Sequence, residues 1–377
     1  MRATRTLPLA ITMTLALSAC GGSALSGGGG EDDNDDKVKI ALLVPQSGVY
    51  APLGKDMEAG FRLYLEANDN KLGGKDVDLT VVDEGAGPED GVPAGTKLAQ
   101  DESVDAVVGV VNSATALGLT DAFDEAKKPL IVGNAGADDI TGKESSPYVW
   151  RTSFSNSEVG GAIGKHVAEE VGDGKVYLVG PDYAAGKEFL AGFKESFEGA
   201  GGKIAGTQMT PFGKTTNFQP YLQKVRNAKP KAVFAFYAGS EAVTFVKQYD
   251  QLGLHDQIPF YGTGFLTEGG ALKAQGKSAE GIFTSLHYSS ELDNDANKAF
   301  VKDYMAANDN KPTVYSVQAY DAGVVLNKAL EEGSGGDQIV EGLKNTGEVD
   351  SPRGPWSFSD KQTGPDLLPA QGREGQR

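Results

Sequence analysis

Short polar segments that follow β-rich apolar runs carry most of the side chains that could bind or transform a small molecule. They are rich in Ser, Thr, Asn, Gly and Tyr, and they comprise Ser47 to Gly54, Asn112 to Thr115, Asn134 to Ala137, Asp182 to Gly186, Tyr237 to Ser240 and Gly262 to Thr267. None contains the Ser-His-Asp set, paired carboxylates or metal cluster that catalysis usually requires. We therefore predict a site that binds a small molecule and releases it unchanged, and not an enzyme.

Asn112 and Ser113 stand where a predicted strand meets a predicted helix. The N-terminus of a helix offers free N–H donors and a positive potential, which suit a carboxylate. The alternative is that Ser113 only caps its helix. Asn134 follows the next strand, where it is either a binding residue or a turn residue.

Metal and cofactor sites have little support in this sequence. The chain has three histidines, at positions 166, 255 and 287, and a single cysteine, Cys20. Such a set does not favour a zinc or iron site. The segment Gly262 to Gly264 lacks the third glycine and the following helix of a dinucleotide loop. We expect neither a metal nor a cofactor.

The N-terminus predicts export and a lipid anchor. A short basic head precedes the apolar stretch Leu7 to Leu17, which is too short to span a bilayer and leads through small residues into Cys20. This resembles a bacterial lipoprotein signal, so we predict a signal peptide at 1–19, lipidation of Cys20 and a flexible linker at 20–36. The alternative is an ordinary secretory signal with a chance cysteine. The favoured interpretation places the protein outside the cytoplasm, anchored to the outer face of the cell membrane.

Composition limits the remaining possibilities. The chain has 377 residues, enough for two domains, and with 39% hydrophobic and 23% charged residues it is typical of globular proteins. Its formal net charge of -17 argues against a nucleic-acid partner, because phosphate binding requires a basic face. No apolar stretch after the signal is long enough to span a bilayer.

Apolar runs alternate with amphipathic stretches, and these elements must position the polar segments. In the first half we predict strands over Val38 to Val44, Val77 to Val82, Val104 to Val111 and Pro129 to Val132, and helices over Asp56 to Asn68, Ala94 to Gln100 and Ala114 to Ala126. The pattern restarts with helices over Ser157 to Val171, Lys187 to Ala200, Phe218 to Ala228, Glu241 to Gln251 and Tyr315 to Leu330, and with strands starting at Lys175, Lys203, Ala232, Pro259 and Gly281. This alternation predicts parallel sheets covered by helices, with ligands bound beyond the carboxyl ends of the strands.

Several motifs, taken in order, resemble type I periplasmic binding proteins, in particular the branched-chain amino-acid-binding family of ABC importers. They are Ile40 to Gly48 with Gly54 to Gly60, Val107 to Gly109 with Asn112 and Ser113, Tyr183 to Gly186, Phe218 to Leu222, Gly262 to Thr267, and Tyr320 to Ala322. The resemblance runs from about Lys37 to Phe358. Each motif is short, and it is their order and spacing that indicate the family.

The resemblance implies an α/β fold of two doubly wound parallel-sheet lobes, joined by three crossover strands and closing on the ligand like a hinge. The first lobe would comprise 37–153 plus 287–349, and the second 154–286 plus 350–377. Arg151 to Ser153 and Ser285 to His287 match the first two crossovers, and Ser351 to Pro355 lies near the third. After Ser359 the chain continues Asp-Lys-Gln-Thr-Gly-Pro-Asp and ends in Gln371 to Arg377 without apolar residues, so this tail is predicted to be disordered.

The same resemblance implies a set of ligand-binding residues. Asn112 and Ser113 would hold the ligand carboxylate, and Tyr183 would cover the ligand from the second lobe. Tyr50 and Leu53 would form walls of the side-chain pocket. Asn134, Ala135 and Gly136 would contact the α-amino and carboxylate groups. Tyr237 and Ala238 would close over the ammonium. Gly136 departs from the family pattern, because a hydroxyl residue is usual there.

The most informative departure concerns the ammonium of an amino acid. Amino-acid binders of the family carry an acidic residue where this chain has Gly264 and Phe265, and Glu268 is nearby but shifted. Losing a buried countercharge weakens binding of an ammonium, whereas an aromatic ring suits a flat apolar ligand. This loop and Asp182 to Gly186 resemble the subgroup that binds aromatic carboxylates such as benzoate derivatives.

We therefore expect a monomeric solute-binding lipoprotein that delivers a benzoate- or phenylpropenoid-type carboxylate to ABC permease subunits. One alternative is a branched-chain or aromatic amino acid as ligand, with Glu268 or Glu241 pairing with its ammonium. Another is a ligand-sensing subunit of a membrane receptor, which could use the same fold. An extracytoplasmic enzyme would need a base or nucleophile in the cleft, and none stands out.

Overall fold

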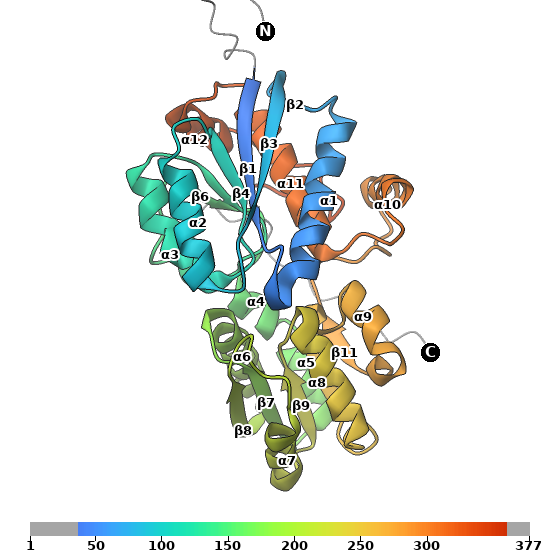
Figure 1. The fold of residues 1–377 in the computed structure, drawn as a ribbon. Helices are drawn as coiled ribbons and strands as arrows, with labels where there is room; N and C mark the ends of the chain where they lie inside the picture. Colours follow the sequence, from blue (N-terminus) through green and yellow to red (C-terminus); the bar gives the residue numbers. More distant parts are fainter. Residues whose placement is uncertain (1–36, 360–377) are drawn as a thin grey trace, which may run out of the picture. The chain divides into compact units, whose positions relative to one another are not determined.

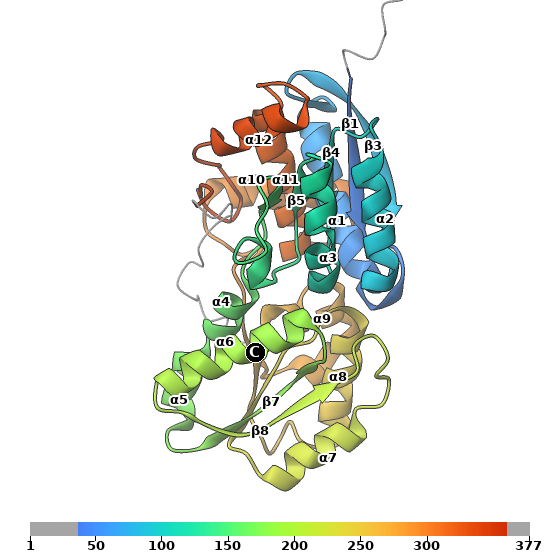
Figure 2. The ribbon, with the colours of Figure 1, turned by 90° about the vertical axis from the view of Figure 1, so that its left-hand side faces the viewer.

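The computed structural model describes residues 37–359, which form two β-sheets with helices on both faces of each (Figure 1, Figure 2). The predicted α/β class with two parallel-sheet lobes is confirmed. The predicted signal peptide 1–19, the linker 20–36 with Cys20, and the tail beyond residue 359 lie outside the described residues. Within residues 37–359, no helix is both long and apolar enough to cross a membrane.

The first sheet has the strand order β2-β3-β1-β4-β5-β6, and all neighbours are parallel except the β2–β3 pair. Its strands are β1 (Lys37–Val44), β2 (Lys71–Leu72), β3 (Lys75–Asp83), β4 (Ala106–Gly109), β5 (Leu130–Val132) and β6 (Val149–Arg151). The helices that pack with it are α1 (Ala51–Ala67), α2 (Pro88–Gln100), α3 (Ser113–Glu125), α10 (Asp295–Ala307), α11 (Val314–Ala329) and α12 (Gly336–Lys344).

Side-chain alternation along β1 explains why this sheet is covered on both faces. Ile40 and Leu42 belong to the buried cluster that contains the apolar faces of α1 and α11. Ala41 and Leu43 belong to the cluster formed with α2 and α3. Successive residues of a strand point to opposite faces, so a continuous apolar run is buried on both sides. Figure 1 shows α1 beside α11, and Figure 2 shows α2 and α3 together on the other face.

The second sheet has the order β11-β10-β9-β7-β8 and is parallel throughout. It comprises β7 (Lys175–Pro181), β8 (Lys203–Thr210), β9 (Ala232–Ala235), β10 (Phe260–Thr263) and β11 (Phe283–Ser285). Its helices are α4 (Asn156–Gly161), α5 (Gly164–Val171), α6 (Ala184–Gly199), α7 (Gln219–Ala228), α8 (Gly239–Gln251) and α9 (Gly270–Gln275). In β7, Val176 and Leu178 pack with α5 and α6, whereas Tyr177 and Val179 pack with α7 and α8.

The predicted helix over Ser157 to Val171 is interrupted between α4 and α5. Glycines are frequent here, and they favour the interruption because glycine is a poor helix former. They also allow close packing, since a Cβ at Gly160 would lie 2.2 Å from the carbonyl oxygen of Phe189 in α6. The prediction missed β2, β6, α9, α10 and α12, whose short or polar sequences carry weak periodic signals.

The end of the described chain, residues 351–358, packs on elements of the first sheet. Trp356 pairs with Val349 through an antiparallel bridge. The ring of Phe358 lies 4.8 Å from that of Trp150, at the end of β6. The predicted domain division placed residues from 350 onward in the second lobe, and the contacts of 351–358 differ from that assignment.

A buried ion pair explains where this segment lies. Arg353 Nε and Nη2 donate to Asp321 Oδ2 of α11, at 2.9 and 2.5 Å. Arg353 Nη2 also donates to the carbonyl oxygen of Thr152 in the first crossover, at 2.8 Å. Both charged groups are buried, so each needs the opposite charge of the other to offset its loss of contact with water. The pair therefore joins the C-terminal segment to α11 and to the crossover after β6.

Candidate ligand-binding site

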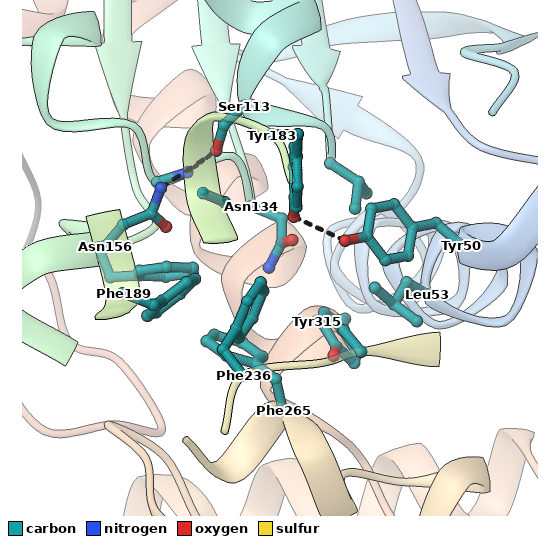
Figure 3. A pocket seen from close by; sticks show the side chains of 15 residues that line it. Tyr50, Leu53, Ser113, Asn134, Asn156, Tyr183, Phe189, Phe236, Phe265 and Tyr315 are labelled. Atoms are coloured by element: carbon teal, nitrogen blue, oxygen red, sulfur yellow. Dashed lines mark hydrogen bonds between the residues drawn. The ribbon is translucent and has the colours of Figure 1, made fainter. Parts of the chain in front are cut away.

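A cavity of about 280 Å³ lies where loops and helix ends of the two sheets meet (Figure 3). It is lined by Tyr50, Leu53, Val111, Ser113, Asn134, Gly136, Phe154, Asn156, Tyr183, Ala185, Phe189, Phe236, Ala238, Phe265 and Tyr315. Most of the lining is apolar or aromatic, with a few polar side chains among it, which is usual for sites that bind small molecules. Such a lining suits a molecule that carries an aromatic or other apolar group.

The N-terminus of α3 forms one polar side of the pocket. Asn112 is the N-cap, and its Oδ1 accepts from the N–H groups of Ala114 and Thr115 at 2.9 and 3.2 Å. Before it, Val110 has φ 66°, a left-handed conformation that β-branched residues rarely adopt. This turn brings Val111 and Ser113 to the pocket, while Asn112 acts as the cap.

A buried carboxylate, Glu84, supports this turn from behind. Its two oxygens accept from the N–H groups of Val111 and Asn112 at 2.7 and 2.8 Å. Burial raises the pKa of Glu84 to about 8, although the two N–H donors lower it. Several N–H groups of the turn thus have partners within the protein.

Ser113 joins the polar side of the pocket to the next loop. Its Oγ accepts from the N–H of Gly136 at 3.3 Å and from Asn156 Nδ2 at 3.2 Å. Asn156 Nδ2 also donates to Glu188 Oε2 at 2.7 Å. A Cβ at Gly136 would lie 2.4 Å from Asn156 Oδ1 and 2.5 Å from the Phe154 ring. The hydroxyl residue usual at this position therefore has no room here.

A chain of amide hydrogen bonds connects the pocket to the second crossover. Asn134 Nδ2 donates to Gln318 Oε1 at 2.8 Å, and Gln318 Nε2 lies 2.8 Å from His287 Nε2. Burial lowers the pKa of His287 well below its ordinary value, so the ring is neutral and can accept this bond. Asn134 is therefore held by α11 as well as by its own loop.

Four phenylalanines form the aromatic wall. The Phe265 ring lies 5.0 Å from that of Phe154 and 5.7 Å from that of Phe189. Phe189 in turn stacks on Phe236 at 4.0 Å. Such tilted, stacked and edge-on arrangements are favourable for aromatic pairs and also suit a bound aromatic ring.

Three tyrosines also line the pocket, and Figure 3 shows Tyr50 and Tyr315 on the side away from Asn156. The hydroxyls of Tyr50 and Tyr183 are 2.6 Å apart and form a hydrogen bond. Phe212 packs against both rings, at centroid distances of 5.3 Å from Tyr50 and 4.3 Å from Tyr183. The third, Tyr315, is in the first turn of α11 and is only 2% exposed.

Eight of the twelve predicted ligand-binding residues line this pocket: Tyr50, Leu53, Ser113, Asn134, Gly136, Tyr183, Ala238 and Phe265. The other four lie elsewhere. Asn112 is a helix cap, and Ala135 accepts a hydrogen bond from Ser153 at its carbonyl oxygen. Tyr237 is fully buried in the core of the second lobe, with its hydroxyl 2.9 Å from Thr210 Oγ1. Gly264 allows close packing, since a Cβ there would lie 2.4 Å from Leu286 Cβ.

The prediction missed seven lining residues: Val111, Phe154, Asn156, Ala185, Phe189, Phe236 and Tyr315. Phe154 directly follows the first predicted crossover, Asn156 lies two residues further on, and Phe236 is the last residue of a predicted strand, so their positions pointed toward the site. Phe189 and Tyr315 lie within predicted helices, where aromatic residues are ordinarily part of the core.

Among residues 37–359, no aspartate or glutamate lines the pocket. Glu241 Oε1 accepts from the N–H of Gly213 at 3.0 Å, and Glu268 Oε1 accepts from the N–H of Val314 at 2.9 Å. Across residues 37–359 there is no group of three or more His, Cys, Asp or Glu side chains that could hold a metal ion.

Comparison with known proteins agrees with this architecture. A model of the periplasmic binding protein family matches residues 37–376. A solute-binding protein of an ABC transporter from R. palustris, solved in complex with benzoate, is 36% identical with a TM-score of 0.83, over 90% of this chain and 96% of that one. A second, from Rhodopseudomonas palustris BisB5 in complex with 3,4-dihydroxy benzoic acid, is 30% identical with a TM-score of 0.81, over 87% and 91%.

A curated relative, the Leu/Ile/Val-binding protein homolog 6 of Brucella melitensis biotype 1, is 32% identical over 86% of this chain and 84% of its own length. These findings confirm the resemblance that the sequence motifs indicated. The chain belongs to the periplasmic binding protein family.

Proposed function

We propose that this chain is the extracytoplasmic solute-binding component of an ABC importer and that it captures an aromatic carboxylate of the benzoate or phenylpropenoid type. The carboxylate would sit beside Ser113 and the N–H of Gly136, near the N-terminus of α3. The ring would lie against Phe265 and its aromatic neighbours. Closure of the two lobes around the ligand would present the bound form to the permease.

The observation that carries this proposal is that no acidic side chain of the described residues lines the pocket. An amino acid brings a buried ammonium, which needs a carboxylate or several oxygen acceptors to replace water. Both acidic candidates, Glu241 and Glu268, accept backbone N–H bonds elsewhere. An aromatic carboxylate has only one charged group, and the polar side of the pocket can bind it with neutral donors.

Similar proteins support the same ligand class. The two solute-binding proteins from Rhodopseudomonas palustris were solved with benzoate and with 3,4-dihydroxy benzoic acid. The Brucella melitensis relative carries the name of a Leu/Ile/Val-binding protein homolog. A hydrophobic amino acid is therefore the ligand against which the proposal should be tested.

Thermal unfolding with two ligand panels tests the proposal, because a ligand that binds only the folded state raises the melting temperature. One panel holds benzoate, 4-hydroxybenzoate and cinnamate, and the other holds leucine, isoleucine, valine and phenylalanine. We expect shifts with the aromatic acids only. Ser113→Ala should reduce the shift given by benzoate, and Ser103→Ala is a matched control because Ser103 does not line the pocket. Shifts confined to the amino acids would contradict the proposal.

We also propose that Cys20 carries a lipid anchor. The support is the apolar stretch Leu7 to Leu17 followed by small residues and the single cysteine of the chain. Acyl chains at this position would hold the protein at the membrane next to its permease. Metabolic labelling with a fatty acid should mark the full-length protein, and Cys20→Ser should abolish the label. A protein that is secreted but unlabelled would contradict the anchor and leave the ligand proposal unaffected.

A further inference from the structure

We propose that Tyr315 selects aromatic carboxylates that bear a hydroxyl group on the ring, on the part remote from the carboxylate. This inference rests on the proposed function, because it takes an aromatic carboxylate as the ligand. It adds a residue that no sequence motif singled out, and it narrows the ligand class.

The first step concerns the phenol oxygen of Tyr315. In the part of the chain that the structure describes, this oxygen is buried and has no hydrogen-bond partner, while the residue lines the pocket. Tyr315 is 2% exposed, and its ring centroid lies 5.9 Å from that of Phe265. Buried hydroxyls in folded proteins nearly always have a partner, and leaving one without a partner is unfavourable.

The second step concerns the other polar side chains of the pocket, which already have partners. The hydroxyls of Tyr50 and Tyr183 bond to each other at 2.6 Å. Asn134 donates to Gln318, and Asn156 donates to Glu188. Among the side chains that line the pocket, the phenol oxygen of Tyr315 is thus the buried polar atom without a hydrogen-bond partner in residues 37–359. A ligand bound in this pocket can supply that partner.

The third step concerns where Tyr315 stands relative to the carboxylate. Figure 3 shows Tyr315 near Leu53 and Phe265, on the side of the pocket away from Ser113 and Asn156. A ligand whose carboxylate lies beside Ser113, as proposed above, would direct the far part of its ring toward Tyr315. A ring hydroxyl there can both donate to and accept from the phenol of Tyr315, whereas the bare ring of benzoate leaves that phenol unpaired.

Burial also determines the form in which Tyr315 acts. It raises the pKa of the phenol well above its ordinary value, so the group stays protonated over the whole physiological range. A neutral phenol can donate to a ring hydroxyl without charge repulsion. The selectivity should therefore not depend on pH between about 6 and 8 through this residue.

The test is isothermal titration of the wild-type protein and Tyr315→Phe with benzoate, 3-hydroxybenzoate, 4-hydroxybenzoate and 4-methylbenzoate. We expect at least one hydroxybenzoate to bind the wild type about five- to tenfold more tightly than benzoate, the usual effect of one neutral hydrogen bond. We expect Tyr315→Phe to remove this preference, so that benzoate and the hydroxybenzoate bind this variant within about twofold of each other. The methyl compound separates the effect of the hydroxyl from that of size.

Tyr320→Phe is the matched control, because Tyr320 lies on the same helix but does not line the pocket. It should retain the preference for the hydroxybenzoate. A preference that persists in Tyr315→Phe would overturn the inference, as would an equal loss of affinity for benzoate and hydroxybenzoate. Wild-type protein that binds benzoate and both hydroxybenzoates equally would also overturn it and would leave the proposed function standing. Wild-type protein that binds none of the acids would overturn the proposed function itself.

Discussion

The hydrogen bond between Tyr50 and Tyr183 should contribute to ligand affinity, because it joins the two lobes beside the pocket. Tyr50 ends the 3-10 helix η1 (Gly48–Tyr50) just before α1, and Tyr183 is the residue before α6. Their oxygens are 2.6 Å apart. Burial raises the pKa of both phenols, so the bond joins two neutral hydroxyls at physiological pH. If the lobes open when the ligand leaves, this bond is lost.

Tyr50→Phe removes the bond with little other change. In the wild type, the centroid of the Tyr50 ring lies 5.3 Å from that of Phe212. A phenylalanine ring at position 50 can keep this aromatic contact. A neutral buried hydrogen bond contributes about 1 kcal/mol, and the hydroxyl left on Tyr183 adds a penalty of similar size. The closed form should lose about 1–2 kcal/mol relative to the open form, which corresponds to about a five- to thirtyfold weaker affinity.

Stopped-flow binding and isothermal titration measure this effect directly. If the bond is lost when the lobes open, its removal should appear chiefly as faster ligand dissociation. Tyr183→Phe should have a similar effect, and the double variant should be no worse than either single one, which corresponds to a coupling energy of about 1–2 kcal/mol. Additive effects of the two substitutions would refute the reasoning, as would a change confined to the association rate.

Three further predictions concern the carboxylate, the buried ion pair and a buried acid. Ser113→Ala should weaken benzoate binding about tenfold in isothermal titration, because a hydrogen bond to a charged ligand is lost; an unchanged affinity would place the carboxylate elsewhere. Asp321→Ala should lower the free energy of unfolding in urea by about 3–5 kcal/mol, because Arg353 is left buried without its partner; a loss below about 1 kcal/mol would contradict this. Burial raises the pKa of Glu241 from 4.5 to about 7, so between these values the folded chain retains a proton that the unfolded chain has lost, and this contribution to stability falls as the pH rises. Glu241→Gln should therefore flatten the decrease in melting temperature between about pH 5 and pH 8, and an unchanged slope would exclude this residue as its source.

The fold was largely predictable because its signals are local. Apolar runs such as Ile40 to Val44 predict buried parallel strands, and their alternation with amphipathic helices predicts the two sheets. The polar loops beyond the strands are also predictable from position, which is why the sequence alone points to Ser113 and Asn134. The break between α4 and α5 was missed, because it depends on the close approach of α6 as well as on local glycines.

The sequence by itself determined the class of protein, the loops that form the pocket and the missing countercharge at Gly264 and Phe265. Only the tertiary structure decided which side chains in those loops reach the ligand. Tyr50 and Tyr183 are 133 positions apart, and their bond forms only because the two lobes meet. Tyr315 is a helix residue like any other in the sequence, and it becomes a pocket residue through the packing of α11. Such contacts depend on distances between elements, which no local pattern of residues encodes.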